Sequence, residues 1–261
     1  MNRSLQWLPY MVVLVVGLVF AGFALQSSKP PEIHRGVVLV ELFTSEGCSS
    51  CPPADALLSR LREKQSLNGI EVIPLGFHVD YWNSLGWMDR FSSRSYSERQ
   101  EKYARQFGLE GPYTPQMVVD GSRELVGNNS RGAEDAILKA AGEPPSAEVT
   151  ISSPSANEVL IRVQDKNPKE SGDVMLAISE DNLETNVKAG ENNGHVLRHA
   201  AVVRDFERLG RLSGGSFERT IQPKAAADWK TKDVRLVVFV QDPSKGSIAG
   251  AASIPWTSLS R

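Results

Sequence analysis

Cys48 and Cys51 are the only cysteines in this 261-residue chain, and two serines separate them. A structural disulfide framework uses more cysteines at wider spacing, and a zinc site needs ligands beyond one such pair. The pair follows an apolar run, Val37–Phe43, and precedes Pro52, a residue that suits the first turn of a helix. Because helix N–H groups can stabilise a thiolate, this position favours thiol–disulfide exchange. We expect Cys48 to be the more exposed, attacking thiol and Cys51 to be its buried resolving partner.

The N-terminal residues predict export. Arg3 precedes an apolar segment, residues 7–25, that is just long enough to cross a bilayer of about 30 Å as a helix. Cleavage after Ala24 fits this segment, and so does an uncleaved anchor with Arg3 on the cytoplasmic side. We therefore expect residues 1–28 to be a signal peptide or an N-terminal membrane anchor. The rest of the chain is expected in a bacterial periplasm, either soluble or held at the inner membrane.

Composition and compartment limit the partners. The formal net charge is −2 and no basic run suits nucleic acid, so no nucleic-acid partner is expected. No cofactor is expected either. In an oxidising compartment the cysteine pair can rest as a disulfide, and such a small loop gains little stability from the bond, which favours a reactive role. The expected partners are thiols or disulfides of exported proteins, and the membrane if residues 7–25 are retained.

The chain divides at a turn-rich linker, residues 142–146. Before it, strand and helix patterns alternate; after it, short alternating runs separated by turn signals predict an antiparallel β-sandwich. The first part is expected to contain strands at Val37–Phe43, Ile70–Phe77, Gln116–Val119 and Glu124–Val126, a hairpin turn at Asp120-Gly121, and helices after Pro52, over Ser92–Phe107 and over Ala133–Ala141. The second is expected to contain strands at Glu148–Ile151, Glu158–Val163, Val174–Ser179, His195–Val203, Phe217–Ile221 and Arg235–Gln241. We interpret the long segment Asn182–Gly194 as a solvated crossover.

Several motifs of this chain together resemble one family. They are Glu41–Asp55, His78–Trp82, Gly86-Trp87 and Tyr113–Gln116 in the first part, and Gly190–Asn192, Val202–Arg204 and Phe239–Asp242 in the second. The family consists of uncharacterised exported bacterial proteins with a thioredoxin-like domain, and is known as domain of unknown function 1223. The resemblance implies export and an α/β thioredoxin-like domain over residues 36–142, followed by an antiparallel β-sandwich domain over residues 147–261. It implies no established activity.

Thr114-Pro115 stands where the thioredoxin-like superfamily carries a cis-proline, immediately before the third core strand. An X–Pro bond adopts the cis form at a cost of only about 0.5–1 kcal/mol. The resemblance implies that Pro115 lies against the cysteine pair and that the backbone of Thr114 pairs with an incoming peptide. Tyr113 and Trp82 could line an apolar groove for that peptide, with core packing as the alternative.

Glu41 is the expected proton acceptor for Cys51. Thioredoxins carry a buried carboxylate six residues before their first cysteine, and Glu41 lies seven before Cys48. With one more residue in the intervening loop, its side chain could still point beneath Cys51, where burial would raise its pKa toward a range useful for acid–base catalysis. The alternative is a glutamate hydrogen-bonded at a strand end.

Alternation places His78, Asp80 and Trp82 on one side of the second strand, at the sheet edge that carries the cysteine turn. His78 could stabilise the Cys48 thiolate or act as a general base, with Asp80 fixing its ring. Asp80 and Trp82 are also candidate substrate contacts, and ordinary packing is the alternative for His78. We interpret His199, far along the chain, as a packing residue of a strand.

The cysteine pair and its neighbours predict an exported thiol–disulfide oxidoreductase, in which Cys48 exchanges with a protein substrate and Cys51 resolves the mixed disulfide. Two alternatives stay open. Cys48, Cys51 and His78 could hold Cu(I) in a periplasmic carrier, since soft thiolates suit that ion. In the other, the protein is a non-catalytic binding module whose cysteines merely brace a loop. The sequence does not separate oxidase, reductase and isomerase.

Overall fold

In the computed structural model, which describes residues 36–166 and 172–260, β1 (Val38–Thr44) is buried along its whole length. Most of its residues are apolar, and valine and phenylalanine among them suit a strand that is covered on both faces. It pairs in parallel with β3 (Ile70–His78) and antiparallel with β4 (Gln116–Val119). Because β1 and β3 run in parallel, they end at the same edge of the sheet, where Thr44 lies opposite His78.

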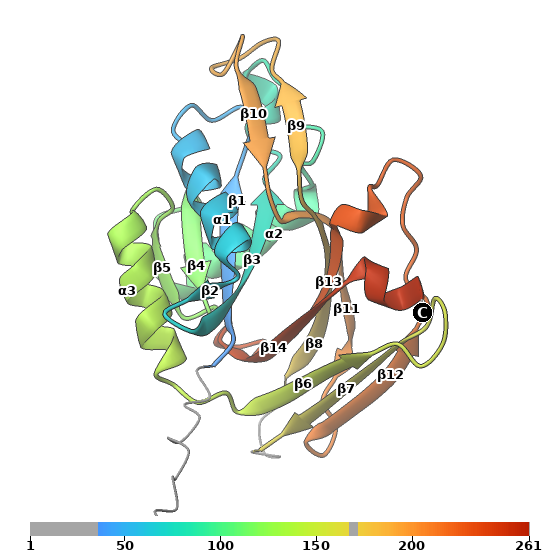
Figure 1. Cartoon of the computed structure of the whole chain (residues 1–261). Helices are drawn as coiled ribbons and strands as arrows, with labels where there is room; N and C mark the ends of the chain where they lie inside the picture. Colours follow the sequence, from blue (N-terminus) through green and yellow to red (C-terminus); the bar gives the residue numbers. More distant parts are fainter. Residues whose placement is uncertain (1–35, 167–171, 261) are drawn as a thin grey trace, which may run out of the picture. The chain divides into compact units, whose positions relative to one another are not determined.

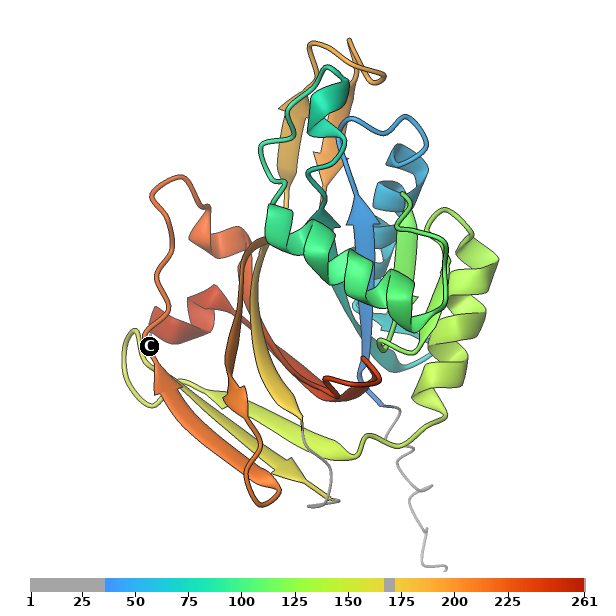
Figure 2. The same cartoon turned by 180° about the vertical axis from the view of Figure 1, so that it is seen from behind.

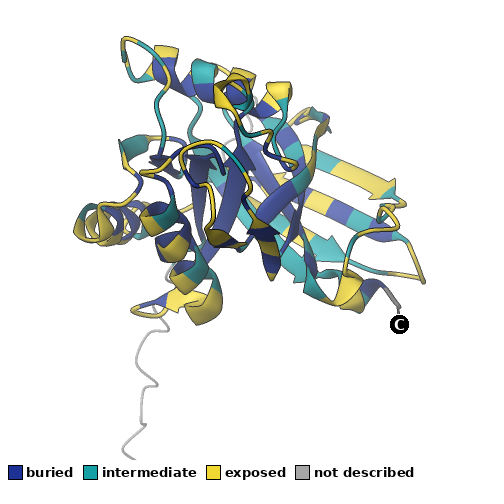
Figure 3. Cartoon of the chain, turned by 90° about the horizontal axis from the view of Figure 1, so that it is seen from above, coloured by how far each residue is buried: buried dark blue, intermediate teal, exposed yellow. Residues whose placement is uncertain are grey.

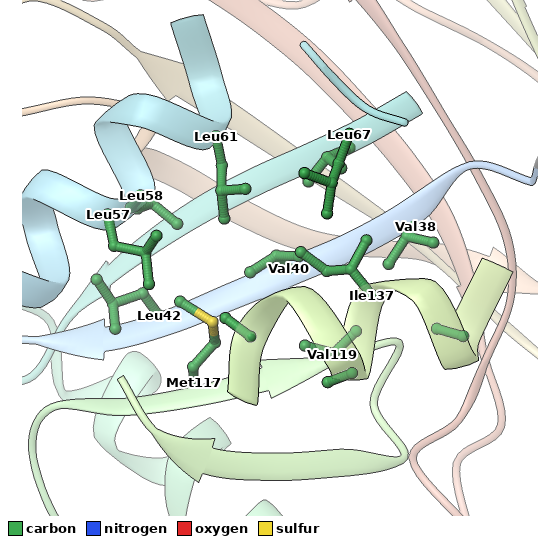
Figure 4. Close-up of a cluster of buried hydrophobic side chains, with 14 of the residues drawn as sticks. Val38, Val40, Leu42, Leu57, Leu58, Leu61, Leu67, Met117, Val119 and Ile137 are labelled. Atoms are coloured by element: carbon green, nitrogen blue, oxygen red, sulfur yellow. The ribbon is translucent and has the colours of Figure 1, made fainter. Parts of the chain in front are cut away.

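Two helices cover one face of this part of the sheet. They are α1 (Pro52–Lys64) and α3 (Ser130–Ala141). The side chains of Val40 and Leu42 point toward them and join Ile137 of α3 in one apolar cluster (Figure 4). The proline start of α1 and the alternation of β1 therefore bring the helix that follows the cysteines onto this face.

A third helix, α2 (Arg94–Gln106), covers the opposite face (Figure 2). The intervening residues of β1, Leu39 and Phe43, pack there with Tyr103 of α2. Phe239 from the second part of the chain joins the same cluster. The core on this face is therefore shared between the two parts of the chain.

The predicted hairpin is present. β4 is followed by β5 (Arg123–Val126), and the turn residues Asp120 and Gly121 both have positive φ, 45° and 62°, as a type I′ turn requires. A side chain at Gly121 would collide with the carbonyl of Gly246, so the close approach also demands glycine. A short strand, β2 (Ser66–Leu67), pairs with β3.

The second part of the chain continues the same sheet. Its strands β8 (Asp173–Glu180), β11 (Val202–Arg211), β13 (Val234–Gln241) and β14 (Ile248–Pro255) give the order β14-β13-β8-β11-β3-β1-β4-β5 in a nine-stranded sheet that includes β2. The junction is a parallel pairing of Val202 with Gly76, whose N–H donates to the carbonyl of Ala201 at 2.7 Å. The linker at 142–146 therefore does not separate two independent sheets. Gly76 lets the chain approach this closely, because a Cβ there would already touch Leu58 and the carbonyl of Ala201.

A second, three-stranded antiparallel sheet covers the far end of the main sheet (Figure 1). It contains β6 (Ala147–Ser152), β7 (Val159–Asp165) and β12 (Ser216–Ile221), in the order β12-β7-β6. Ile161 of β7 packs with Leu176 and Leu236 of the main sheet in one buried cluster. Two layers of strands therefore face each other over part of this region, and one layer belongs to the sheet of the first part.

Two more strands form a separate hairpin, β9 (Leu183–Asn186) and β10 (Val196–His199). The hairpin stands at the edge where β1 and β3 end (Figures 1 and 2). The predicted single strand His195–Val203 is therefore two strands, β10 and β11, separated by a bend in which Ala201 has a φ of 53°. Three short 3-10 turns complete the elements: η1 (Asn83–Leu85), η2 (Thr231–Asp233) and η3 (Trp256–Ser260).

The expectations for residues 1–28, including the apolar segment 7–25, lie outside the described residues. Within the ranges 36–166 and 172–260, no helix combines the length and apolar character needed to cross a membrane.

Seen from above, the buried residues follow the central strands, and exposed residues occupy the outer helix faces and loops (Figure 3).

Candidate active site

The cysteines lie in the turn between β1 and α1. The N–H of Cys48 donates to the carbonyl of Ser45, and the N–H of Cys51 donates to the carbonyl of Cys48, each at 3.2 Å. Cys51 is the N-cap residue of α1, and Pro52 occupies the first turn. The two cysteines form a disulfide, with their Cα atoms 5.4 Å apart. Both sulfurs therefore lie at the positive end of a helix, where a thiolate is favoured.

Both cysteines are completely buried, with 0% of either exposed, although the two serines between them are exposed. The expectation that Cys48 is the more exposed thiol is therefore wrong. The β9–β10 loop packs on this turn: the side-chain amide of Asn192 donates to the carbonyls of Glu46 and Cys48, at 2.9 and 3.0 Å. Beside it, the Glu191 carboxylate accepts the N–H of Ser49 at 3.0 Å.

The segment Asn182–Gly194 is accordingly not a solvated crossover. Val187 and Asn192 are buried, and the loop between β9 and β10 packs on the cysteine turn. Sequence alone gave no local reason for this, because the contact joins residues 144 positions apart.

One serine of the turn makes a hydrogen bond to a cysteine sulfur. The Ser50 hydroxyl lies 3.3 Å from Sγ of Cys48, in hydrogen-bond contact. A hydroxyl that donates to sulfur stabilises the thiolate more than the thiol, since the bond to a charged acceptor is stronger. Ser50 thus favours the charged form of Cys48 after reduction.

His78 is buried at the end of β3 and its Nδ1 lies 2.6 Å from the Asp89 carboxylate. Asp89, rather than Asp80, therefore fixes this ring. The strand ends at His78, so alternation does not continue to Asp80, whose carboxylate accepts the hydroxyl of Ser97 instead. Burial lowers the pKa of His78, but the charge and hydrogen bond of Asp89, with smaller contributions from Asp55 and Glu46, raise it by more.

The Asp89 carboxylate also ties His78 to the cysteine turn. It accepts the N–H of Glu46 at 2.9 Å and the N–H of Phe91 at 2.9 Å. Burial raises the pKa of Asp89, but His78 and these two donors lower it by more, so the net shift is downward. The two shifts together favour a buried imidazolium–carboxylate pair.

His199 of β10 completes the buried group from the second part of the chain. Its ring lies 4.9 Å from that of His78 between centroids, and its Nε2 lies 3.4 Å from Oε1 of Glu46. The other oxygen of Glu46 accepts the indole N–H of Trp87 at 2.8 Å. Among the described residues, neither ring nitrogen of His199 has a hydrogen-bond partner. Because Val196 and Leu197 precede it, the sequence pattern predicted that this histidine packs in a strand and has no role in a site.

Asp55 lies on α1, one turn after Cys51, and is also buried. Residues four apart on a helix share a face, so Asp55 lies on the side of α1 that carries Cys51. Burial raises the pKa of Asp55, although the charges of His199 and His78 oppose the shift. We call Glu46, Asp55, His78, Asp89 and His199 the polar cluster, since contacts and charge interactions connect them behind the cysteine turn.

Glu41 does not reach the cysteines. It lies between Val40 and Leu42, so its side chain points to the α2 face of the sheet rather than to α1. There its carboxylate accepts two hydrogen bonds from Arg99, at 2.5 and 2.9 Å, and one from the hydroxyl of Tyr103 at 2.6 Å. The buried carboxylate nearest the resolving cysteine along the chain is Asp55.

The peptide bond between Thr114 and Pro115 is cis, as expected. The Thr114 hydroxyl accepts the indole N–H of Trp82 at 2.8 Å, and Trp82 in turn packs against Gly47, beside Cys48. Pro115 also approaches the start of α1: a Cβ on Gly127 would lie 3.1 Å from Pro115 and 3.2 Å from Ala54. Trp82 therefore links Thr114 to the cysteine turn, and Pro115 lies near the first turn of α1.

Tyr113 takes a different direction. Its hydroxyl lies 2.7 Å from the Glu124 carboxylate of β5, and its carbonyl accepts the side-chain amide of Gln100 at 2.6 Å. These contacts fix Tyr113 on α2 and β5 rather than on the cysteine turn.

Within residues 36–166 and 172–260, no three or more His, Cys, Asp and Glu side chains are grouped so that they could hold a metal ion. The copper set Cys48, Cys51 and His78 is not assembled. The two sulfurs are bonded to each other, and Nδ1 of His78 is held by Asp89.

Known proteins resemble this chain over most of its length. The family described as "Protein of unknown function (DUF1223)" matches residues 39–241. Among solved structures, the chain is similar to protein AGR_C_4864 from Agrobacterium tumefaciens, with 31% identity and a TM-score of 0.69, over 84% of this chain and 94% of that one. It is also similar in fold to HBP35 of Porphyromonas gingivalis, with 17% identity and a TM-score of 0.62, over 87% and 77% of the two chains. No curated protein sequence matches it.

Proposed function

This chain belongs to the family described as protein of unknown function (DUF1223), and we propose that it is an exported thiol–disulfide oxidoreductase acting through Cys48 and Cys51. One observation carries the proposal: the bonded cysteine pair begins a helix and is backed by buried ionisable groups. Perturbed titratable groups gather at functional sites more often than elsewhere. The element order of residues 36–142, with a cis Thr114-Pro115 bond ahead of β4, supports a thioredoxin-like classification of this part.

The proposed oxidation begins when a thiolate of a reduced protein substrate attacks Sγ of Cys48. A bond forms between these sulfurs, the Cys48–Cys51 bond breaks, and its electron pair leaves on Sγ of Cys51. The second substrate thiolate then attacks the substrate sulfur of the mixed disulfide and releases Cys48 as a thiolate. Two electrons pass from the substrate dithiol to the cysteine pair, and the two thiol protons pass to the released sulfurs or to solvent. Reduction of a substrate disulfide follows the same steps in reverse.

Three groups support the released thiolates. The N-terminus of α1 and the Ser50 hydroxyl stabilise negative charge on sulfur. A protonated His78, held by Asp89, adds positive charge behind the turn. Asp55 is the group that we assign to move the proton of Cys51, because it shares a helix face with that residue and burial raises its pKa. Asp55 thus takes the part that Glu41 was expected to play.

Substrate contacts are assigned to the residues around the turn. Pro115 and the backbone of Thr114 would hold an extended substrate strand, and Trp82 links them to Gly47. Tyr113 is left out of this set, since its hydrogen bonds fix it to Glu124 and Gln100.

A specific observation favours a competing function. Both sulfurs are fully buried, as expected of a bridge that braces a binding surface and does not react. That alternative predicts a very low reduction potential and no covalent intermediate.

The decisive experiment measures the reduction potential of Cys48–Cys51 by equilibration with glutathione or dithiothreitol buffers. A reactive pair is expected between about −270 and −120 mV, the range of thiol–disulfide oxidoreductases. In parallel, Cys51→Ser should trap a mixed disulfide when its Cys48 thiolate attacks the disulfide of an oxidised exported protein and releases one substrate thiolate, whereas Cys48→Ser should trap none. A potential below about −300 mV together with no trapped species would establish a structural bridge.

A further inference from the structure

The β9–β10 loop, residues 187–195, is an unusual cover for a disulfide. Val187 and Asn192 are the buried residues of this loop, and the other residues from 188 to 195 are exposed or half-buried. The amide of Asn192 bonds two carbonyls of the cysteine turn, those of Glu46 and Cys48. We infer that this loop is a lid over the Cys48–Cys51 bond and that it must open before a protein thiol can react; its regulatory meaning rests on the proposed function.

The need for opening follows from the chemistry of exchange. An attacking thiolate must reach a sulfur atom of the disulfide, so the rate depends on access to that atom. Neither cysteine offers any exposed surface in this closed arrangement. The exposed serines between them show that the turn itself lies near the surface, and the β9–β10 loop is one of the elements packed on it.

The lid also occupies polar backbone groups of the cysteine turn. Asn192 donates to the carbonyl of Cys48, and Glu191 accepts the N–H of Ser49. An incoming peptide strand pairs through the same kinds of group, N–H donors and carbonyl acceptors. A substrate strand held at Thr114 that also reached these two groups would displace Asn192 and Glu191 from them.

The lid is mounted on a hairpin that can let it move. β9 and β10 pair only with each other among the described strands, and a two-stranded hairpin of four residues per strand has little stability of its own. The base of the hairpin is held by the buried side chains of Leu183, Leu197 and His199. The hinge must therefore lie between these residues and the tip of the loop. At the tip, Gly190 packs on Trp87 with a φ of 72°, a conformation that glycine adopts readily.

The test is the rate at which dithiothreitol reduces Cys48–Cys51 in the full chain, followed by quenching with a maleimide and electrophoresis. Asn192→Ala removes both amide hydrogen bonds and is expected to raise the rate about tenfold, while Asn193→Ala, an exposed neighbour, should leave it unchanged. Glu191→Ala, at an exposed position that folding tolerates, should raise the rate about threefold. If Asn192→Ala does not fold, the reduction rate of Glu191→Ala decides whether the loop acts as a lid.

A variant far from the lid serves as the control for a general loss of stability. Asn129→Ala removes the N-cap of α3 and lowers stability without touching the lid, so its reduction rate should match wild type. If folded Asn192→Ala and Glu191→Ala are both reduced at the wild-type rate, the lid is overturned. If both are reduced faster but no form exchanges with reduced exported proteins, the lid stands and the proposed function falls.

Discussion

Nδ1 of His78 and Oδ2 of Asp89 lie 2.6 Å apart in a fully buried pair, eleven residues apart in sequence. The same Asp89 oxygen accepts the N–H of Glu46, at the start of the cysteine turn. One carboxylate therefore connects the charge of a histidine to the backbone that carries the cysteine pair. This arrangement has a measurable dependence on pH.

Asp89→Asn should lower the free energy of unfolding most strongly in a limited pH window. The raised pKa of His78 means that its contribution is fully present below about pH 6.5 and is lost as the pH rises through the folded value. The lowered pKa of Asp89 means that its contribution is present above about pH 4 and is lost as the pH falls through the folded value. Urea unfolding from pH 3 to 9 should show a wild-type advantage of about 3 kcal/mol near pH 5–6.

The control for this pair is Asp135→Asn, an exposed carboxylate of α3, whose effect should be small at every pH. A difference between wild type and Asp89→Asn that does not vary with pH would contradict an imidazolium–carboxylate pair.

Asp55→Asn should make the protein more stable and less reactive. Burial raises the pKa of Asp55, so its contribution to stability decreases as the pH rises from about 4 through the folded value. An amide of the same shape avoids that cost. The free energy of unfolding, measured with urea, is therefore expected to rise by about 1–2 kcal/mol at pH 8. Removal of the proton acceptor should slow resolution of the mixed disulfide about 100-fold. An unchanged resolution rate across pH would remove Asp55 from the mechanism.

Ser50→Ala should raise the pKa of the Cys48 thiol in the reduced protein, because the hydroxyl donor to sulfur is lost. Alkylation by iodoacetamide as a function of pH, in a Cys51→Ser background, measures this pKa directly. Ser50→Thr keeps the hydroxyl and should behave as wild type. Equal alkylation profiles for Ser50→Ala and Ser50→Thr would show that the hydrogen bond has no effect on the thiolate.

Glu41→Gln should affect stability and leave the exchange chemistry unchanged. The substitution removes the charge partner of Arg99, whose Cζ lies 4.9–5.5 Å from the centroids of four aromatic rings. The free energy of unfolding is therefore expected to fall by about 3 kcal/mol. The pH profile of exchange should match wild type, because Glu41 lies on the opposite face of the sheet from α1. A displaced pH profile would restore Glu41 to the proton path.

Much of the first part of the fold could be predicted because local pattern determines it. The apolar run before Cys48 forms β1, Pro52 begins α1, and Asp120-Gly121 forms the hairpin turn. Two strands of the second part escaped prediction. β9 has only four residues, and β14 consists largely of alanine, glycine and serine, which have weak strand preferences and are ordered here by pairing with β13.

The cysteine pair and the cis bond at Pro115 could also be anticipated, but not the groups behind them. β1 is apolar on both faces, so alternation could not tell which helix Glu41 would meet. Asp89 follows β3 through an irregular segment in which periodicity carries no information. Asn192 and His199 reach the site by tertiary folding across more than 140 residues, which no local pattern records.

The pairing of Gly76 with Val202 has a consequence for how the protein can be divided. A fragment that stops at residue 142 would lack this pairing, which leaves the N–H of Gly76 at the edge of β3 without the carbonyl of Ala201. It would also uncover Phe77 and Tyr96, which pack beside Val203 and Phe239 in the intact chain. We expect such a fragment to self-associate, and the part that carries the cysteines to fold only together with the strands that follow it.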